Sequence, residues 1–290
     1  MSSRRDFIKQ SSLFAAGAFI TKENFFKHQN KIGLQLYTVR NEMGKDAKAT
    51  LAKIAQIGYK EVETINYSNG KWFGLTPPEL SAVFKENGLS SPSGHTFPGG
   101  FFIKGGWEDL WKKAVEDSKT IGQEYIVIPW LEPNYRDSID NFKKLAAELN
   151  KAAAIAEQSS LKLAYHNHDF EFADLNGQHP FEILIKETDP SLVKFEMDLY
   201  WVTKAGHNPL DLFAAHPHRF DMWHIKDMDN TDKKFFTEVG SGVIDFKAIF
   251  KKAKQSGMKY FFVEQDICPG NPFDSIAKSI DYLKKNIVRS

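Results

Sequence analysis

The 290-residue sequence has one cysteine, Cys268, and almost no net charge. A single cysteine excludes an intramolecular disulfide framework and a zinc site built from several thiolates. Lys and Arg number 38 and Asp and Glu number 37, whereas proteins that hold nucleic acids through phosphate contacts carry a basic surplus. No apolar run reaches the roughly 20 residues that cross a bilayer. We therefore expect no nucleic-acid partner and no stable membrane span.

The bulk composition is that of an ordinary globular protein. Hydrophobic residues make up 42% and charged residues 26% of the chain, which excludes global disorder. The length fits either two domains of roughly 150 residues or a single α/β barrel of roughly 250 residues. No linker or shift in composition divides residues 31–290, so we expect one domain there.

Residues 1–30 differ from the rest and resemble a twin-arginine export signal. Arg4 and Arg5 precede a short apolar run, Leu13 to Ile20, and an Ala-Gly-Ala motif at 16–18 offers a cleavage site. This interpretation predicts a periplasmic or otherwise exported protein. If the segment is instead a disordered amphipathic tail, a cytoplasmic location is expected.

From residue 31 onward, short runs rich in Val, Ile, Phe and Tyr alternate with helix-like segments. Such runs are typical of parallel strands that are buried on both faces. The expected strands are Ile32–Val39, Glu61–Ile65, Leu89–His95, Tyr125–Trp130, Leu161–His168, Val193–Leu199, Phe220–Ile225 and Tyr260–Glu264. Capping residues, prolines and terminal glycines between them predict helices, of which the clearest are 47–57, 76–88, 137–158 and 246–256.

Eight strand-helix units in about 260 residues predict an α/β protein with a single closed (β/α)8 TIM barrel. The alternative is an open doubly wound sheet, which normally binds a nucleotide through a glycine-rich turn after its first strand. The segment after the first expected strand, residues 37–42, has neither a G-x-G-x-x-G motif nor a Walker lysine. The barrel is therefore the preferred fold.

In such a barrel the chemistry lies where the strands end, at their carboxyl-terminal face. The fifth expected strand ends with His166 and His168, and side chains two residues apart on a strand point the same way. The sixth, seventh and eighth strands end with Asp198, His224 and Glu264. Four consecutive strands thus bring imidazole, carboxylate, imidazole and carboxylate to one rim.

This mixed nitrogen and oxygen set suits a divalent ion such as Mn²⁺, Zn²⁺ or Co²⁺ better than Mg²⁺. Buried carboxylates at Asp198 and Glu264 need a metal ion or a cationic partner to neutralise them. Taken singly, each residue has a simpler explanation: a strand-end histidine often serves as a structural hydrogen-bonding group, and a strand-end acid often pairs with a cation such as Lys226 or Arg219.

Several segments, in this order and spacing, resemble one family. They are 32–35 (Ile-Gly-Leu-Gln), 58–63 (Gly-Tyr-Lys-Glu-Val-Glu), 224–227 (His-Ile-Lys-Asp), 239–246 (Val-Gly-Ser-Gly-Val-Ile-Asp-Phe) and 263–264 (Val-Glu). The chain resembles, over residues 31–290, the xylose isomerase-like barrels grouped as sugar phosphate isomerases/epimerases, which include inosose dehydratase and endonuclease IV. The resemblance implies one divalent ion, with Asp198, His224 and Glu264 as three of its ligands, and it allows a homodimer.

The chain departs from that family on the fifth strand. Many relatives read Glu-Asn-His where this chain reads His166-Asn167-His168, so His166 falls on a metal-binding glutamate. A histidine can still ligate, but a mechanism in which two glutamates exchange a proton loses one member. The resemblance then points toward the dehydratase branch. Glu171 can supply a carboxylate from the following loop, or be a solvated loop charge.

We expect a small-molecule carbohydrate substrate. The ion would chelate a carbonyl and a neighbouring hydroxyl, and His168 or Glu264 would remove the proton between them. Lys226 would hold a substrate anion or the enolate oxygen, or else pair with Asp227. Aromatic faces and strand-end polar groups are the expected substrate contacts. They are Gln35, Tyr37, Glu63, His95, Trp130, Glu171, Trp201, Asp227 and Glu238.

Three functions follow from this arrangement. The first is a metal-dependent carbohydrate isomerase or epimerase that acts by enolisation. The second is a metal-dependent lyase, either a dehydratase or an enzyme that cleaves keto-glycosides. The third is a sugar-binding barrel without catalysis. Repair of DNA in the manner of endonuclease IV is disfavoured, because the charge is nearly neutral and the set of metal ligands is too small.

Overall fold

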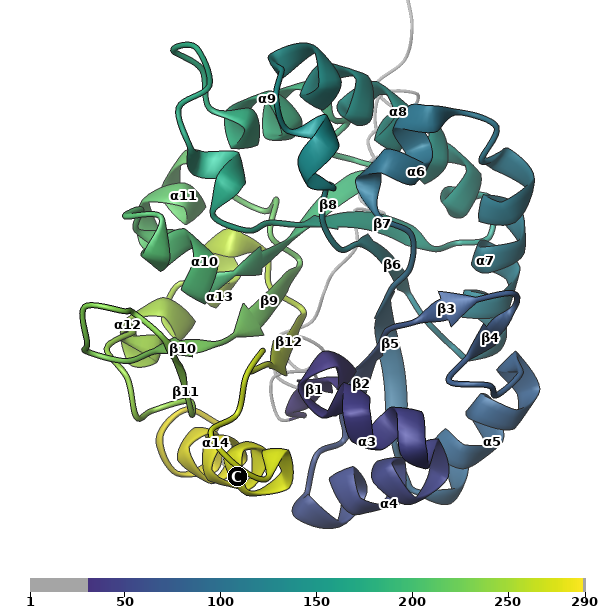
Figure 1. Cartoon of the computed structure of the whole chain (residues 1–290), viewed down its shortest axis with the longest axis vertical. Helices are drawn as coiled ribbons and strands as arrows, with labels where there is room; N and C mark the ends of the chain where they lie inside the picture. The colour runs from purple at the N-terminus through teal and green to yellow at the C-terminus, as the bar shows by residue number, and fades with distance from the viewer. Residues whose placement is uncertain (1–30, 289–290) are drawn as a thin grey trace, which may run out of the picture.

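The structure is a computed structural model that describes residues 31–288; the export signal expected in residues 1–30 lies outside them. Eight parallel strands form a closed barrel in the order β1-β12-β9-β8-β7-β6-β5-β2 (Figure 1). The strands are β1 (Gly33–Gln35), β2 (Glu61–Thr64), β5 (Ser90–His95), β6 (Tyr125–Ile128), β7 (Lys162–His166), β8 (Val193–Asp198), β9 (Met222–Ile225) and β12 (Tyr260–Val263). The predicted single (β/α)8 barrel is confirmed.

Helices surround the barrel (Figure 1). They are α3 (Arg40–Lys45), α4 (Ala47–Ile57), α5 (Pro77–Glu86), α6 (Gly99–Lys104), α7 (Glu108–Thr120), α8 (Ile139–Glu157), α9 (Pro180–Glu187), α10 (Leu199–Lys204), α11 (Pro209–Ala215), α12 (Phe246–Phe250), α13 (Ala253–Ser256) and α14 (Pro272–Asn286). Short 3-10 helices are η1 (Leu36–Val39), η2 (Pro133–Tyr135) and η3 (Phe170–Phe172), and two small ribbons pair β3 (Tyr67–Ser68) with β4 (Lys71–Trp72) and β10 (Asp227–Met228) with β11 (Phe236–Thr237). Among residues 31–288, no helix is both long and apolar enough to cross a membrane.

Two predicted elements differ from the structure. The expected strand 32–39 ends at Gln35, because the side chain of Gln35 accepts the backbone N–H of Tyr37 and the chain turns into η1. The expected helix 246–256 is divided into α12 and α13 by a turn at Lys251 and Lys252, and each piece buries its own apolar residues.

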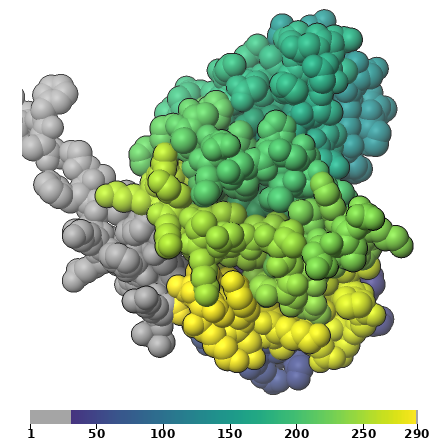
Figure 2. Space-filling view, turned by 90° about the vertical axis from the view of Figure 1, so that its left-hand side faces the viewer, coloured from purple at the N-terminus to yellow at the C-terminus, as the bar shows by residue number. Residues whose placement is uncertain are grey.

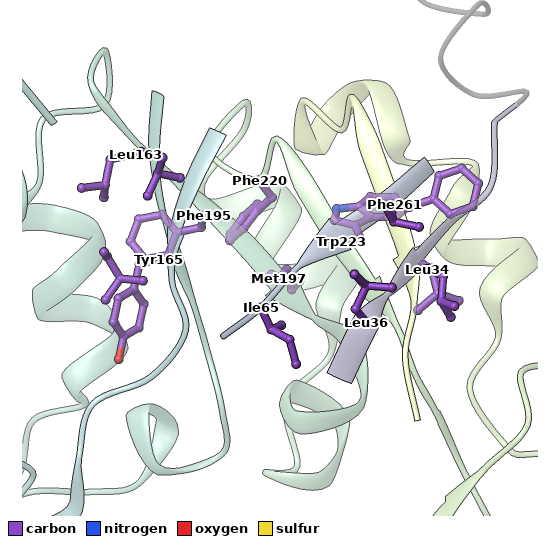
Figure 3. Close-up of a cluster of buried hydrophobic side chains, with 14 of the residues drawn as sticks. Leu34, Leu36, Ile65, Leu163, Tyr165, Phe195, Met197, Phe220, Trp223 and Phe261 are labelled. Carbon is purple, nitrogen blue, oxygen red and sulfur yellow. The ribbon is translucent and has the colours of Figure 1, made fainter. Parts of the chain in front are cut away.

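The barrel has two apolar regions, which follow from the alternation of side chains along each strand. One side of every strand faces the helices, and Figure 3 shows part of this layer: Leu34, Leu163, Phe195, Met197, Trp223 and Phe261. The other side faces the interior, where a smaller cluster lies: Tyr125, Val127, Ala164, Met222, Tyr260 and Phe262. The interior positions that follow along the strands are polar, so the apolar cluster forms a floor beneath them.

The chain closes on itself at its two ends. Strand β1 pairs with both β2 and β12. Helix α14, in yellow, lies beside the earliest described elements, in purple, in both views (Figures 1 and 2). The closed ring therefore brings β2 and β5 from one end of the chain into the same interior as β8, β9 and β12.

Candidate active site

A cavity of about 560 Å³ opens where the strands end. Its lining is aromatic near the surface and ionisable at depth. The lining residues are Tyr37, Ile65, Asn66, His95, Pro129, Trp130, Arg136, His166, His168, Asp169, Phe170, Trp201, Lys226, Glu264 and Asp266. This is the size of a small-molecule site and its position is the one at which TIM barrels carry their chemistry.

Three imidazoles converge on one oxygen of Glu196, in the middle of the barrel. Its Oε2 lies 2.8 Å from Nε2 of His95, 3.1 Å from Nδ1 of His166 and 3.1 Å from Nε2 of His224. The strands dictate this arrangement, because His166 and Glu196 are neighbours in the β7–β8 register. The other oxygen of Glu196 is buried and has no hydrogen-bond partner among the described residues.

His224 lies between two further carboxylates. Its Nε2 is 2.6 Å from Oε2 of Glu63, and its Nδ1 is 2.8 Å from Oε2 of Glu264. Gln35 and Ser93 each donate a hydrogen bond to Glu63 and so fix its position. Both ring nitrogens of His224 therefore face negative oxygens, an arrangement that needs either an imidazolium or a metal ion in place of a proton.

Lys226 neutralises the acids at the opening of this cluster. Its Nζ lies 3.0 Å from Oδ2 of Asp198, 2.8 Å from Oε2 of Glu264 and 2.6 Å from Oδ1 of Asp266. The ammonium is buried, and it has no ion pair with Asp227. The acids Asp198 and Glu264, expected as metal ligands, thus share a cation that belongs to the chain.

Burial and mutual attraction set the protonation of this cluster. Burial alone would lower the pKa of His224, but Glu196, Glu264 and Glu63 raise it well above its ordinary value. Burial would likewise raise the pKa of Glu264, yet Lys226 and His224 hold it well below the usual range. The pKa of Glu63 rises to about 7, chiefly through burial and then through the charge of Glu196. The site thus concentrates negative charge around a few cations.

Two imidazoles beside the cavity stay neutral: burial, and then the charge of His224, lowers the pKa of His166 to about 3, and the second is His168. Burial, and then the charges of His166 and Lys226, lower its pKa well below the ordinary value. Its Nδ1 has no hydrogen-bond partner among residues 31–288. Glu171 accepts the backbone N–H of His168 at 2.8 Å and the hydroxyl of Tyr165 at 2.7 Å, and it is fully buried. Glu171 is therefore a positioning residue and not a solvated loop charge.

Two overlapping groups of donor atoms fit a metal ion. Asp198, His224 and Glu264 form one, and each offers an atom within 4.8 Å of the others. His166 is adjacent to this group, since its Nε2 lies 3.7 Å from Oδ2 of Asp198. The second consists of His95, His166, Glu196 and His224. Both combine imidazole with carboxylate, which suits a divalent transition ion, and the orphaned buried oxygen of Glu196 favours the presence of a cation.

The structure brings most of the expected site residues together. Tyr37, Trp130 and Trp201 line the cavity, and Tyr37 and Trp130 are 41% and 38% exposed. Gln35 and Glu63 lie beneath, within the buried cluster.

Besides Gln35, Glu63 and Glu171, two expected substrate contacts lie outside the cavity lining. Asp227 does not line the cavity: its carboxylate accepts the backbone N–H groups of Met228, Gly240, Gly242 and Ile244 and so shapes the loop after β11. Glu238 pairs with Ser275 and Lys278 on α14. Both carboxylates are engaged by the fold, and neither residue lines the cavity.

Sequence reasoning missed three residues of this region: Glu196, Asp266 and Arg136. Glu196 is two residues before Asp198 on the same strand, so the alternation that joined His166 to His168 also indicated Glu196. Asp266 follows Glu264 at the same spacing. No pattern indicated Arg136, which lies in a loop.

A family model described as a xylose isomerase-like TIM barrel matches residues 51–286, so the chain belongs to this family. Inosose dehydratase from Clostridium beijerinckii is 28% identical over 176 residues, which are 54% of this chain and 58% of that protein. The match thus spans little more than half the length of this relative.

Solved structures cover more of the chain. A sugar phosphate isomerase/epimerase from Parabacteroides distasonis is 26% identical, with a TM-score of 0.77 over 92% of this chain and 96% of that one. The IOLI protein with a bound zinc atom is 17% identical, with a TM-score of 0.70 over 89% of this chain and 100% of that one. The latter likeness concerns the fold alone.

Proposed function

We propose that this protein is a metal-dependent lyase that removes a proton next to the carbonyl of a keto-sugar or cyclic keto-polyol and expels a β-hydroxyl as water. The observation that carries the proposal is His168: a neutral imidazole that lines the cavity, next to a buried lysine and carboxylates. A general base needs this combination of an unprotonated nitrogen and access to the substrate.

The residues of the chain have distinct parts in this reaction. His168 takes the proton from the carbon beside the carbonyl, and the electron pair of that C–H bond forms the enolate. Lys226 holds the enolate oxygen. The electrons then return to re-form the carbonyl and a carbon–carbon double bond, the C–O bond to the β-hydroxyl breaks, and protonated His168 gives its proton to the departing oxygen. Tyr37 and Trp130 present their faces to the sugar at the opening.

His166, Asp198, His224 and Glu264 are the proposed ligands of one divalent ion, preferably Mn²⁺, Zn²⁺ or Co²⁺. The ion, when bound, would act as a Lewis acid that acidifies the C–H bond beside the chelated carbonyl. A divalent ion held by Asp198 and Glu264 would neutralise the two carboxylates that Lys226 now neutralises, and the ammonium would then be available to a substrate oxygen.

Isomerisation or epimerisation is the second candidate. It shares the enolate, and the likeness to the Parabacteroides distasonis sugar phosphate isomerase/epimerase supports it. Elimination is preferred for two reasons. His166 stands where the family's epimerases have a metal-binding glutamate, and the relative from Clostridium beijerinckii is named inosose dehydratase.

The test is incubation of the Mn²⁺-, Co²⁺- or Zn²⁺-loaded protein with scyllo-inosose, 3-keto-glucosides and ketohexoses in ²H₂O. Elimination gives an enone with new ultraviolet absorbance, and isomerisation gives an isomer of the substrate that carries one carbon-bound deuterium and has lost no water. Isomerisation without enone would overturn the lyase in favour of the second candidate. Binding of a sugar without either product, in every metal form, would support a non-catalytic sugar-binding barrel.

A further inference from the structure

Arg136 presents an unpaired cation to the cavity. It follows η2, and its Nε donates a hydrogen bond of 2.6 Å to the carbonyl oxygen of Leu131. The guanidinium carbon lies 3.5 Å from the centre of the Phe170 ring and 5.2 Å from that of Trp130. The backbone bond and the aromatic contacts hold the guanidinium in one place before any ligand arrives.

Neither terminal nitrogen of Arg136 donates a hydrogen bond within residues 31–288, and no carboxylate there comes within 4.0 Å. Of the acids near it, Glu132 accepts the backbone N–H of Gly100, and Glu171 accepts the hydroxyl of Tyr165 and the backbone N–H of His168. Asp169 lines the same cavity but does not pair with Arg136.

The other cations of the cavity region are occupied. Lys226 has three carboxylates around it, and Arg40 donates to the carbonyl oxygens of Tyr37 and Asp266. Arg136 is therefore the cavity-lining cation whose donors are left for a ligand in the described part of the chain.

We propose that Arg136 binds an oxyanion on the substrate, a carboxylate or a phosphate, through its two terminal nitrogens. This inference rests on the proposed function, and it names the class of substrate as an acidic sugar. Because Nε is already engaged, the open edge of the guanidinium is the end that carries both terminal nitrogens, which matches two oxygens of a carboxylate or phosphate side by side.

The position of Arg136 also says where the oxyanion lies on the substrate. Phe170 contacts Arg136 and also stacks against His168, with ring centres 5.8 Å apart and planes 19° apart. The oxyanion therefore lies one aromatic ring away from the proposed base. We therefore expect the anionic group to be attached directly to the sugar.

Equilibrium binding tests the inference without turnover. D-glucuronate, D-glucose 6-phosphate and D-glucose are titrated into the full chain, with calorimetry as the readout. An anionic probe should bind at least about 10-fold more tightly than glucose, and Arg136→Gln should weaken it about 10- to 100-fold while leaving glucose unchanged. Arg136→Lys keeps the positive charge but lacks the pair of terminal nitrogens, and it should bind the anionic probe more tightly than Arg136→Gln does.

Lys112→Gln is the matched control, because it removes one exposed positive charge on α7, outside the cavity, and should change nothing. The preferred anion tells whether the source is a sugar acid or a sugar phosphate. Equal or absent binding of all three probes, or an equal loss for all three in Arg136→Gln, would overturn the inference. His168→Asn, which removes the proposed base, should keep glucuronate binding, so failure of the lyase proposal is distinguishable from failure of this one.

Discussion

The ammonium of Lys226 lies 3.0 Å from a carboxylate oxygen of Asp198, where β8 and β9 end side by side. Asp198 pairs in register with His224, and Lys226 is two residues further along the chain. An acid expected to bind a metal ion thus has a cation of the chain as its partner. The same acid is buried, and burial raises its pKa to about 6 even though Lys226 opposes the rise.

Lys226→Met should destabilise the metal-free protein by about 3 to 5 kcal/mol, because it leaves the acids around it without a counter-charge in a buried position. Saturating Mn²⁺ should recover a large part of the loss, since the ion neutralises the same acids. Urea unfolding with and without Mn²⁺ measures both effects. Lys112→Met removes an exposed lysine and should stay within about 0.5 kcal/mol of the wild type. A Lys226 variant as stable as the control would contradict the pairing.

Variants distinguish the two groups of metal donors. Glu264→Gln and Asp198→Asn should lose the ion on dialysis, whereas His95→Gln should retain one ion per chain, because His95 belongs only to the second group. Elemental analysis of the purified proteins gives the stoichiometry, and circular dichroism checks that each variant is folded. The reverse pattern would move the ion to the group around Glu196.

His168→Asn should lower kcat by about 10²- to 10⁴-fold, the usual contribution of a general base, while the metal content stays the same. Steady-state kinetics on the substrate identified by the screen provides the measurement. His207→Asn, which replaces an exposed histidine outside the cavity, should keep full activity. Undiminished turnover in His168→Asn would assign the base to another residue.

Glu171 should make stability fall as pH rises. Burial raises its pKa from 4.5 to about 7, so between these values the folded state keeps a proton that the unfolded state has released. The contribution of Glu171 to the free energy of unfolding is therefore greatest below about pH 4.5, and about 3 kcal/mol of it is lost by pH 7 and above. Glu171→Gln keeps the shape and removes the titration.

Urea unfolding at pH 4.5, 6 and 7.5 measures this effect. The difference in unfolding free energy between wild type and Glu171→Gln should shift by about 3 kcal/mol over that range, with the wild type losing more. Parallel curves at all three values would contradict the raised pKa of Glu171 in the folded protein.

Asp227→Asn should destabilise the protein by about 2 to 4 kcal/mol. The carboxylate accepts four backbone N–H groups, two on each oxygen, and an amide nitrogen placed there would face two donors. Thermal unfolding provides the measurement. Glu238→Gln is the comparison, because its partner Lys278 is exposed and such pairs contribute at most about 1 kcal/mol. Equal effects of the two substitutions would contradict the role given to Asp227.

Much of the fold could be predicted from the sequence, because strands and helix ends depend on short segments of the chain. Eight apolar runs and the helix ends between them are properties of short segments, and helix α4 ends where Gly58 takes a positive φ of 116°. Asp198, His224 and Glu264 were found because each ends a strand, and strand ends meet at one face of a barrel. The break within 246–256 was missed, since it depends on which residues each piece buries.

The particular contacts of the site were decided by tertiary structure. Glu63 belongs to an early strand, yet its carboxylate lies 2.6 Å from His224, 161 positions later, because β2 and β9 face the same interior of a closed ring. Alternation along a strand tells which side chains point inward, but only the closure of the barrel tells which of them touch. The sequence by itself determined the set of inward-facing acids and imidazoles; the tertiary structure decided that Glu196 is their common partner, that Lys226 neutralises the acids, and that Arg136 is left open.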